Sequence, residues 1–309
     1  MRVLPALMLL AACGSPETST DTPLDPMSLA PLVSQAELET SIKGLEALGT
    51  RYTIGMGDER AKDYLVERIT AMGLVAELDP FTAVSEAANN IIVKHPGTVE
   101  PNVVFIFSAH YDSTSNTAAT AAPGADDNGT GVAAVLEAMR LMTKHSFKYS
   151  IWFVFTAAEE QGSLGSKHMV KWIPQQGVTV RGVIAPDMIG YWPQGEGDQM
   201  DILGDPASEF LVDHMVGVAT RLEVGFKKWI EHQYCYGDDH TSFQEAGMPA
   251  ITPMDCVEAH NVAASTEDTP HYHRMSDTFV TLHMGMTTRV ASVITVTLAE
   301  LAEPTLAAF

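Results

Sequence analysis

The chain contains an apolar run that leads into two glutamates, Trp152-Phe-Val-Phe-Thr-Ala-Ala-Glu-Glu-Gln-Gly-Ser-Leu-Gly165. A run of this kind is typical of a buried strand, here one that carries Glu159 and Glu160 at its C-terminal end. In an open α/β sheet, ligands bind beyond the C-terminal ends of the strands. Two neighbouring buried carboxylates repel each other unless a positive charge neutralises them, and a divalent metal ion does so. The run therefore predicts a metal site at a sheet edge.

Strand and helix patterns alternate along the rest of the chain. Apolar strand patterns cover 89–94, 103–108, 150–156, 181–185 and 250–252. Helical spacing covers 35–48, 58–72, 208–221 and 277–301. A further helix is expected after the Gly-rich loop at 124–131 and ends near 144. This alternation predicts an α/β fold with a mostly parallel central sheet sandwiched by helices.

Length and charge narrow the class of protein. The 309 residues are 46% hydrophobic, and we expect residues 34–309 to form a single domain. The formal net charge of −21 argues against nucleic acid and anionic membrane surfaces as partners, and is compatible with bound metals.

The N-terminus has the pattern of an export signal. Residues 1–13 combine one positive charge, a short apolar core and small residues before Cys13, which resembles a bacterial lipoprotein signal. The alternative is an ordinary signal peptide cleaved nearby. Residues 14–33 are rich in Ser, Thr, Pro and Asp, and we expect them to be a disordered tether. The expected location is the bacterial cell envelope, either the periplasm or the outer membrane, or the outside of the cell, with membrane contact only through a lipid at Cys13.

Two further cysteines, Cys235 and Cys256, remain in an exported chain. Their number suggests a disulfide between them, while two unpaired buried thiols stay open as the alternative.

Candidate metal ligands lie at the ends of expected strands, in loops and near the last expected helix. They are His110 and Asp112, Asp126 and Asp127, Glu159 and Glu160, Asp187, and the pair His271 and His273. Mixed imidazole and carboxylate sets suit zinc, and the absence of thiolates favours a catalytic site. Two metals that share one bridging carboxylate would need about five protein ligands and leave room for a water. One glutamate of the adjacent pair would then serve as general base.

Five motifs follow one another along the chain: His110-Tyr-Asp112-Ser, Gly124-Ala-Asp126-Asp127-Asn-Gly-Thr-Gly, Glu159-Glu160-Gln-Gly-Ser-Leu-Gly-Ser, Asp187-Met-Ile-Gly-Tyr and Tyr272-His273-Arg-Met-Ser-Asp277-Thr278. They resemble the motifs of metallopeptidase family twenty-eight, which contains secreted bacterial leucyl aminopeptidases and related di-zinc exopeptidases. The similarity extends from about Gly49 to Thr278 and implies the fold of the zinc-dependent exopeptidases, which is phosphorylase/hydrolase-like.

The resemblance implies two zinc ions with Asp126 as the bridging ligand. It places Glu160 and His273 on one ion, and His110 and Asp187 on the other. His271 is a rival to His273, but the following Asp277-Thr278 favours His273.

The resemblance also assigns the catalytic groups. Glu159 would be the general base, and Asp112 would hydrogen-bond His110 and fix its tautomer. A cis peptide, which the family has between its two aspartates, would fall at Asp126-Asp127.

Two places depart from the family pattern. Arg274-Met275 follows the last zinc histidine where the family more often has Thr or Ser and then Pro. Gly237-Asp238-Asp239-His240 stands where aminopeptidase members often carry Ser-Asp-His. We expect Tyr236 and His240, in and beside this segment, to contact substrate.

The activity implied is removal of the N-terminal residue from peptides or proteins with a free N-terminus, by a chain that we expect to be a monomer. The alternatives are a carboxypeptidase or dipeptidase of the same family and a non-catalytic, zinc-containing surface binding protein. Glutaminyl cyclases share the fold but use one zinc ion, and the presence of both His110 and Asp187 argues against that activity.

Overall fold

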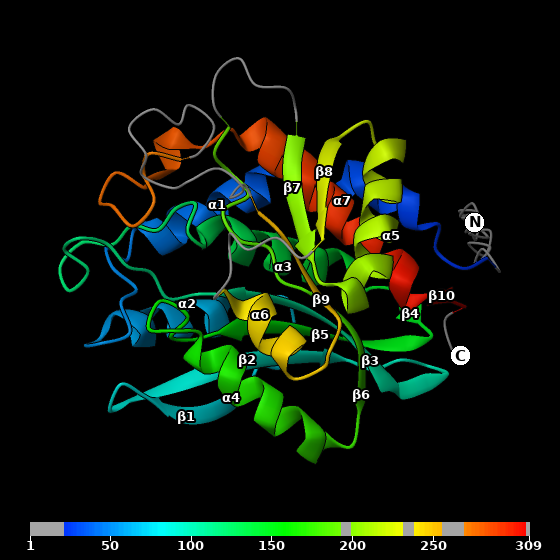
Figure 1. The fold of residues 1–309 in the computed structure, drawn as a ribbon, viewed down its shortest axis with the longest axis horizontal. Coiled ribbons are helices and arrows are strands. Elements are labelled where there is room, and N and C mark those ends of the chain that lie inside the picture. The colour runs from blue at the N-terminus through cyan, green and yellow to red at the C-terminus, as the bar shows by residue number, and fades with distance from the viewer. Residues whose placement is uncertain (1–21, 193–198, 231–237, 255–268, 307–309) are drawn as a thin grey trace, which may run out of the picture.

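The computed structural model describes residues 22–192, 199–230, 238–254 and 269–306 (Figure 1). The predictions made for the signal at 1–13, including lipidation at Cys13, and for Cys235, Tyr236 and Cys256 lie outside these residues. None of the helices in the described ranges is long and apolar enough to cross a membrane.

Helices and strands alternate through most of the described chain. The strands are β1 (Glu77–Ala83), β2 (Glu86–His95), β3 (Glu100–His110), β4 (Ser146–Phe147), β5 (Tyr149–Thr156), β6 (Thr179–Ile184), β7 (Gln199–Gly204), β8 (Gly225–Ile230), β9 (Ala250–Pro253) and β10 (Pro304–Thr305). The α-helices are α1 (Gln35–Glu46), α2 (Gly57–Ala71), α3 (Gly129–Met142), α4 (Leu164–Trp172), α5 (Glu209–Arg221), α6 (Asp239–Glu245) and α7 (Met284–Ala302). The 3-10 helices are Pro26–Leu32, Ile173–Gln176, Pro206–Ser208 and Phe279–Thr281.

Eight strands form one mixed sheet in the order β1-β2-β5-β3-β6-β9-β7-β8. The central neighbours β5, β3, β6 and β9 are parallel, β1 and β2 add an antiparallel edge, and β7 is antiparallel to β9. The remaining two strands, β4 and β10, pair separately. The predicted fold class, a mostly parallel sheet between helices, is confirmed.

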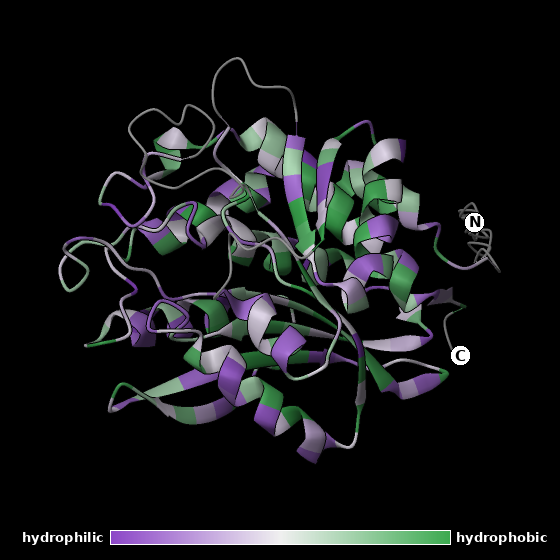
Figure 2. Ribbon diagram, in the orientation of Figure 1, coloured by the Kyte–Doolittle hydropathy of each residue, from purple (hydrophilic) through white to green (hydrophobic). Residues whose placement is uncertain are grey.

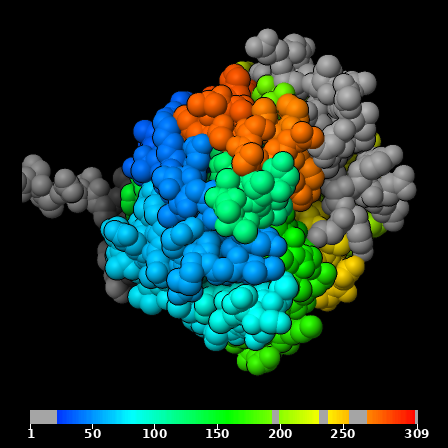
Figure 3. Space-filling model, turned by 90° about the vertical axis from the view of Figure 1, so that its left-hand side faces the viewer, coloured from blue at the N-terminus to red at the C-terminus, as the bar shows by residue number. Residues whose placement is uncertain are grey.

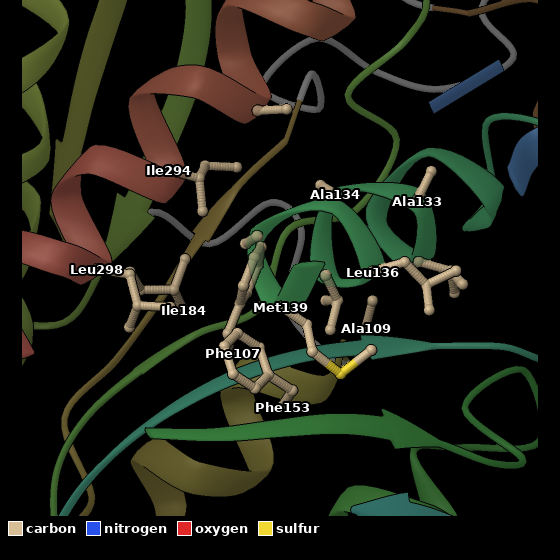
Figure 4. Packing of buried hydrophobic residues seen from close by; sticks show 14 of the residues in the cluster. Phe107, Ala109, Ala133, Ala134, Leu136, Met139, Phe153, Ile184, Ile294 and Leu298 are labelled. Carbon is tan, nitrogen blue, oxygen red and sulfur yellow. The ribbon is translucent and has the colours of Figure 1, made fainter. Parts of the chain in front are cut away.

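The central strands are apolar throughout because both faces of the sheet are covered. Along β5, Phe153 packs into one core and Trp152 and Val154 into another. Figure 4 shows Phe107 and Phe153 of the sheet beneath Met139 of α3. The first core includes residues of α1, α2, α3, α5 and α7, and the second includes residues of α4 and α6. The hydropathy colouring of Figure 2 shows the same inward concentration of apolar residues.

Part of the expected tether, residues 14–33, is ordered. Pro26–Leu32 forms a 3-10 helix that Asp25 caps by accepting a hydrogen bond from the Met27 amide. Leu29 is fully buried, and Ser292 of α7 donates a hydrogen bond to the Ala30 carbonyl. The expectation of disorder was therefore wrong for Pro26–Leu32, because composition did not show that Leu29 inserts into the core.

The C-terminal ends of the parallel strands meet at one edge of the sheet. His110 ends β3, Glu159 and Glu160 follow β5, and Asp187 follows β6. Figure 3 views the face on this side, where the segments coloured for residues near 50, 115 and 275 lie side by side. Hydrogen bonds join them, since the Asn116 amide donates to the His273 carbonyl at 3.2 Å and the Thr50 hydroxyl to the Ala118 carbonyl at 2.7 Å.

One buried acid near this edge makes stability depend on pH. Asp58 lies in the first turn of α2 with 4% of its surface exposed, and its Oδ1 accepts a hydrogen bond from the Glu59 amide. Burial raises the pKa of Asp58 from 3.8 to about 7, helped by the nearby charge of Asp112. The folded state thus holds this proton more tightly than the unfolded state does. The stability that the protonated carboxyl contributes is fully present below pH 3.8 and is lost as pH rises to about 7.

Replacement of Asp58 by Asn should therefore stabilise the protein above neutrality, because the amide stays uncharged. We expect a gain of about 1–2 kcal/mol at pH ~8, after allowance for screening by water, and little or no gain at pH ~4.5. Thermal or urea unfolding at both pH values measures it, with Asp63→Asn on the exposed face of the same helix as the control. Equal effects of Asp58→Asn at the two pH values would contradict the assignment.

Candidate metal centre and catalytic base

Three side chains from separate strand ends form the first group of possible metal ligands. His110 Nε2 lies 3.0 Å from Asp187 Oδ2 and 3.4 Å from Asp127 Oδ1. All three residues are buried. The opposite ring nitrogen, Nδ1, lies 3.2 Å from the Asp112 carbonyl, which leaves Nε2 directed at the two carboxylates.

The second group lies on the other side of the same aspartate. His273 Nε2 is 3.0 Å from Glu160 Oε2 and 3.3 Å from Asp127 Oδ2. Asp127 thus directs one carboxylate oxygen into each group. A carboxylate shared in this way could bridge two neighbouring metal ions, which lie about 3.5–4 Å apart in two-metal sites.

The donor spacing fits zinc. Ligand atoms at the usual zinc distance of about 2.0–2.1 Å in a tetrahedron lie about 3.3 Å from one another. The four histidine–carboxylate separations in the two groups fall between 3.0 and 3.4 Å. Glu160 Oε1 and Asp187 Oδ1 are also buried without a hydrogen-bond partner in the part of the chain that the structure describes. Unpaired buried oxygens are costly, and a bound cation removes that cost.

Asp126, which the sequence suggested as the bridging ligand, belongs to neither group. Its Oδ1 accepts hydrogen bonds from the Gly190 amide at 2.8 Å and the Thr130 hydroxyl at 3.0 Å, and its Oδ2 accepts one from the Tyr191 amide at 3.0 Å. These donors engage both oxygens. The assignment of the bridge to Asp126 was therefore wrong by one residue: Asp126 holds the segment after Asp187, and Asp127 faces the two histidines.

The cis peptide also lies one residue later than predicted: it joins Asp127 to Asn128 and not Asp126 to Asp127. Asp277 supports this turn by accepting hydrogen bonds from the Asp126 amide at 2.8 Å and the Asp127 amide at 3.0 Å. Asn128 caps α3 by accepting a hydrogen bond from the Gly131 amide at 2.9 Å, and donates to the Pro186 carbonyl. The turn thus links the helix to the segment that carries Asp187.

Asp112 contacts both His110 and the glutamate pair. Its Oδ1 is 3.6 Å from His110 Nδ1, longer than a hydrogen bond, so the predicted carboxylate contact is replaced by the carbonyl contact. Its carboxylate instead accepts hydrogen bonds from the Glu159 amide at 3.0 Å and the Glu160 amide at 3.2 Å. Asp112 therefore orients the loop that follows β5.

Arg51 supplies a buried positive charge beside these acids, and sequence reasoning assigned it no role. Its guanidinium donates to the carbonyls of Tyr111, Pro123 and Gly124 at 2.6–2.9 Å. The side chain is fully buried. It ties the loop after His110 to the loop before Asp127, and so fixes two of the ligand-bearing segments relative to each other.

Glu159 lies beside the groups without belonging to them. Its Oε1 accepts a hydrogen bond from the Ser163 hydroxyl at 3.1 Å. Burial raises its pKa well above the ordinary value, and the charges of Asp238 and Asp239 at the start of α6 raise it further, while His110 opposes them. A buried carboxylate with a raised pKa is suited to general-base catalysis.

His240, one of the two residues expected to contact substrate, is 5% exposed at the start of α6. Its Nδ1 lies 3.3 Å from Asp238 Oδ2. Asp239, buried beside it, accepts a short hydrogen bond of 2.5 Å from the Thr156 hydroxyl at the end of β5. This pairing brings α6 close to the glutamate pair. Substrate contact by His240 stays a prediction.

The electrostatics of the groups favour a bound cation. Burial raises the pKa of Glu160 to about 7, with a further contribution from the charge of Asp127. Burial likewise raises the pKa of Asp187 well above its ordinary value, although His110 opposes the shift. The pKa of His273 rises to about 10 because its hydrogen bonds with Asp127 and Glu160 outweigh burial. Without added positive charge Glu160 and Asp187 keep their protons to higher pH than an ordinary carboxyl does, and a divalent ion would displace those protons.

The fold and site together define an α/β protein with two adjacent groups of possible metal ligands that share one carboxylate. Residues 90–298 match the family described as Peptidase family M28, the same metallopeptidase family that the sequence motifs resemble. This match covers more than half of the chain, which therefore belongs to that family.

Named proteins similar to this chain agree with the family. A "Probable zinc metalloprotease" of Pyrenophora teres f. teres is 26% identical over 71% of this chain and 56% of the relative. The "Leucine aminopeptidase 1" of Sclerotinia sclerotiorum is 27% identical over 71% of this chain and 60% of its own length. The chain thus spans about three-fifths or less of these relatives. The crystal structure of the Legionella pneumophila LapA aminopeptidase superposes with a TM-score of 0.77 at 20% identity, covering 93% of this chain and 78% of that one. This likeness confirms the fold.

Proposed function

We propose that this chain is an aminopeptidase that removes the N-terminal residue from peptides and uses two zinc ions. One ion would be held by His110, Asp127 and Asp187, and the other by Asp127, Glu160 and His273. The observation that carries the proposal is the shared carboxylate of Asp127, with one oxygen 3.4 Å from His110 Nε2 and the other 3.3 Å from His273 Nε2. Aminopeptidase and zinc metalloprotease names among the relatives support it.

The residues around the groups divide the chemistry between them. Two zinc ions would polarise the scissile carbonyl and lower the pKa of the attacking water. Glu159 takes a proton from that water and passes it to the leaving amine. Asp112 fixes the glutamate loop through the Glu159 and Glu160 amides, which holds the base in place during both transfers.

The charge of the site favours a substrate with a free amine. Besides the ligand carboxylates, the buried acids Asp112, Asp126, Asp239 and Asp277 lie around the two groups, and they outnumber the buried guanidinium of Arg51. Such surroundings attract an α-ammonium group and repel a terminal carboxylate. This argues for cleavage at the N-terminus over the carboxypeptidase alternative.

Release of free amino acids tests the proposal. The purified chain is incubated with matched peptides that carry free or acetylated N-termini, before and after removal of metal by a chelator and again after zinc is restored. We expect N-terminal residues to be released from free peptides only, loss of activity with the chelator, recovery with zinc and about two zinc ions per chain. Release from the C-terminus of acetylated peptides would indicate a carboxypeptidase instead. Two bound zinc ions without cleavage of any peptide would indicate the binding-protein alternative.

We further propose that the protein acts outside the cytoplasm as a lipoprotein anchored at Cys13. The pattern of residues 1–13 supports this. Metabolic labelling with palmitate should mark the wild-type chain and not Cys13→Ser. Export of an unlabelled wild-type chain would favour an ordinary signal peptide.

A further inference from the structure

We infer that Ser163 is a positioning residue for the base Glu159: its hydroxyl holds one carboxylate oxygen so that the other faces the reaction. This inference rests on the proposed function of the site. Its basis is the hydrogen bond of 3.1 Å from Ser163 Oγ to Glu159 Oε1, four residues apart in one tight turn.

The turn itself is held on both sides of Ser163. The amides of Gly162 and Ser163 both donate to the Glu159 carbonyl, at 2.7 and 2.6 Å. The Leu164 amide donates to the Ala158 carbonyl at 3.0 Å as α4 begins. These bonds fix the backbone of the turn, so the Ser163 hydroxyl and the Glu159 carboxylate are attached to the same rigid segment.

The conformation of Ser163 is unusual for a residue with a side chain. Its φ of 56° lies in the left-handed region, which favours glycine. Glycine at this position would relieve that strain. The residue is nevertheless 1% exposed, and its carbonyl accepts hydrogen bonds from the Lys167 amide at 3.0 Å and the Ser166 hydroxyl at 3.1 Å. A side chain kept in a strained, buried turn requires a compensating contact, and the bond to Glu159 provides one.

Orientation of the base explains why such a bond matters for the reaction. A carboxylate rotates broadly about the last bond of its side chain, and only a narrow range of this torsion, repeated after about 180° because the two oxygens are equivalent, directs an oxygen at the attacking water. With Oε1 held by Ser163, Oε2 is the oxygen that accepts and returns the proton. In the part of the chain that the structure describes, the hydroxyl is hydrogen-bonded to the base, and Ser163 belongs to neither group of possible metal ligands, so its loss should lower kcat and leave KM and zinc binding unchanged.

Two substitutions separate the effect of the Ser163 hydroxyl from the effect of the strained backbone. Ser163→Ala removes the hydroxyl and keeps the strained φ, whereas Ser163→Gly removes the hydroxyl and relieves the strain. We expect both to lower kcat about 10-fold, with KM within about twofold of wild type and two zinc ions still bound. Ser163→Cys, which keeps a weak donor at the same place, should recover part of kcat. Lys167→Ala is the control, since this exposed side chain contacts only the Gly162 carbonyl among the bonds of the turn.

A double substitution shows whether Ser163 acts through Glu159. In a Glu159→Gln background, Ser163→Ala should have no further effect on the residual kcat, because the base that it positions is gone. Wild-type activity in Ser163→Gly would overturn the inference, as would equal losses in the wild-type and Glu159→Gln backgrounds. A wild-type chain that binds zinc but cleaves no peptide would overturn the proposed function, and this role with it.

Discussion

Asp127→Asn is expected to reduce bound zinc from two ions per chain to one or fewer and to lower kcat/KM by more than about 100-fold. The amide cannot offer two anionic oxygens, yet Asp127 Oδ1 and Oδ2 each face one histidine. Loss of an outer-shell partner commonly costs about 10–100-fold in metal affinity, and loss of a shared ligand should cost more. Metal analysis of the dialysed protein and titration with zinc measure the change.

Asp126→Asn is the matched control, because the same chemical change is made one residue earlier. This variant should keep two zinc ions. Its new amide nitrogen would meet the Tyr191 amide where Oδ2 now accepts a hydrogen bond, so two donors would face each other. We expect a loss of about 1–3 kcal/mol in unfolding free energy. The reverse pattern, with zinc lost from Asp126→Asn and retained by Asp127→Asn, would restore Asp126 as the bridging ligand.

The one-residue difference between Asp126 and Asp127 shows where sequence reasoning stops. Motif order brings both aspartates to the start of α3, and either has the right chemistry. The choice depends on which carboxylate meets the amides of Gly190 and Tyr191, more than sixty residues further along the chain. No local pattern records such a contact.

Elements with strong local patterns were predicted well, and those without were not. The apolar runs of β3, β5 and β6 mark buried strands because both faces of the sheet are covered. Strand β8 has two exposed lysines in an edge position and was not predicted, and neither were β1, β7, α4 and α6. The last helix was expected to begin at Asp277, but α7 begins at Met284. Asp277 lies before the helix, and its carboxylate accepts hydrogen bonds from the amides of Asp126 and Asp127.

The site was predicted best where the residue type itself carries the chemistry. His110, Glu160, Asp187 and His273 all enter the two groups, as the motifs suggested. Arg51 and Ser163 were not singled out, because arginine and serine are common and their roles arise from burial and from one distant or turn-closing contact. The sequence places Arg51 within Gly49-Thr-Arg-Tyr and Ser163 within the Glu159 motif, but it does not show which groups their side chains contact.

Glu159→Gln should abolish most of the activity while leaving the metal centre intact. The substituted side chain has nearly the same shape and can still accept the Ser163 hydrogen bond through its oxygen, but it takes no proton from water. General-base catalysis contributes about 10²–10⁴-fold, so kcat should fall by that factor. Peptide-release assays measure kcat, and metal analysis should find two zinc ions, because Glu159 belongs to neither ligand group.

Glu160→Gln, the neighbouring substitution, separates the two roles of the glutamate pair. Its Oε2 lies 3.0 Å from His273 Nε2, so loss of the negative charge should weaken the second group and release one zinc ion. Added zinc should then restore part of the activity of Glu160→Gln and none of that of Glu159→Gln. Recovery of the Glu159 variant by zinc would assign Glu159 to the metal, and another residue would have to be the base. If zinc restores activity to Glu160→Gln but not to Glu159→Gln, the two adjacent carboxylates have different roles, Glu160 as a metal ligand and Glu159 as the base.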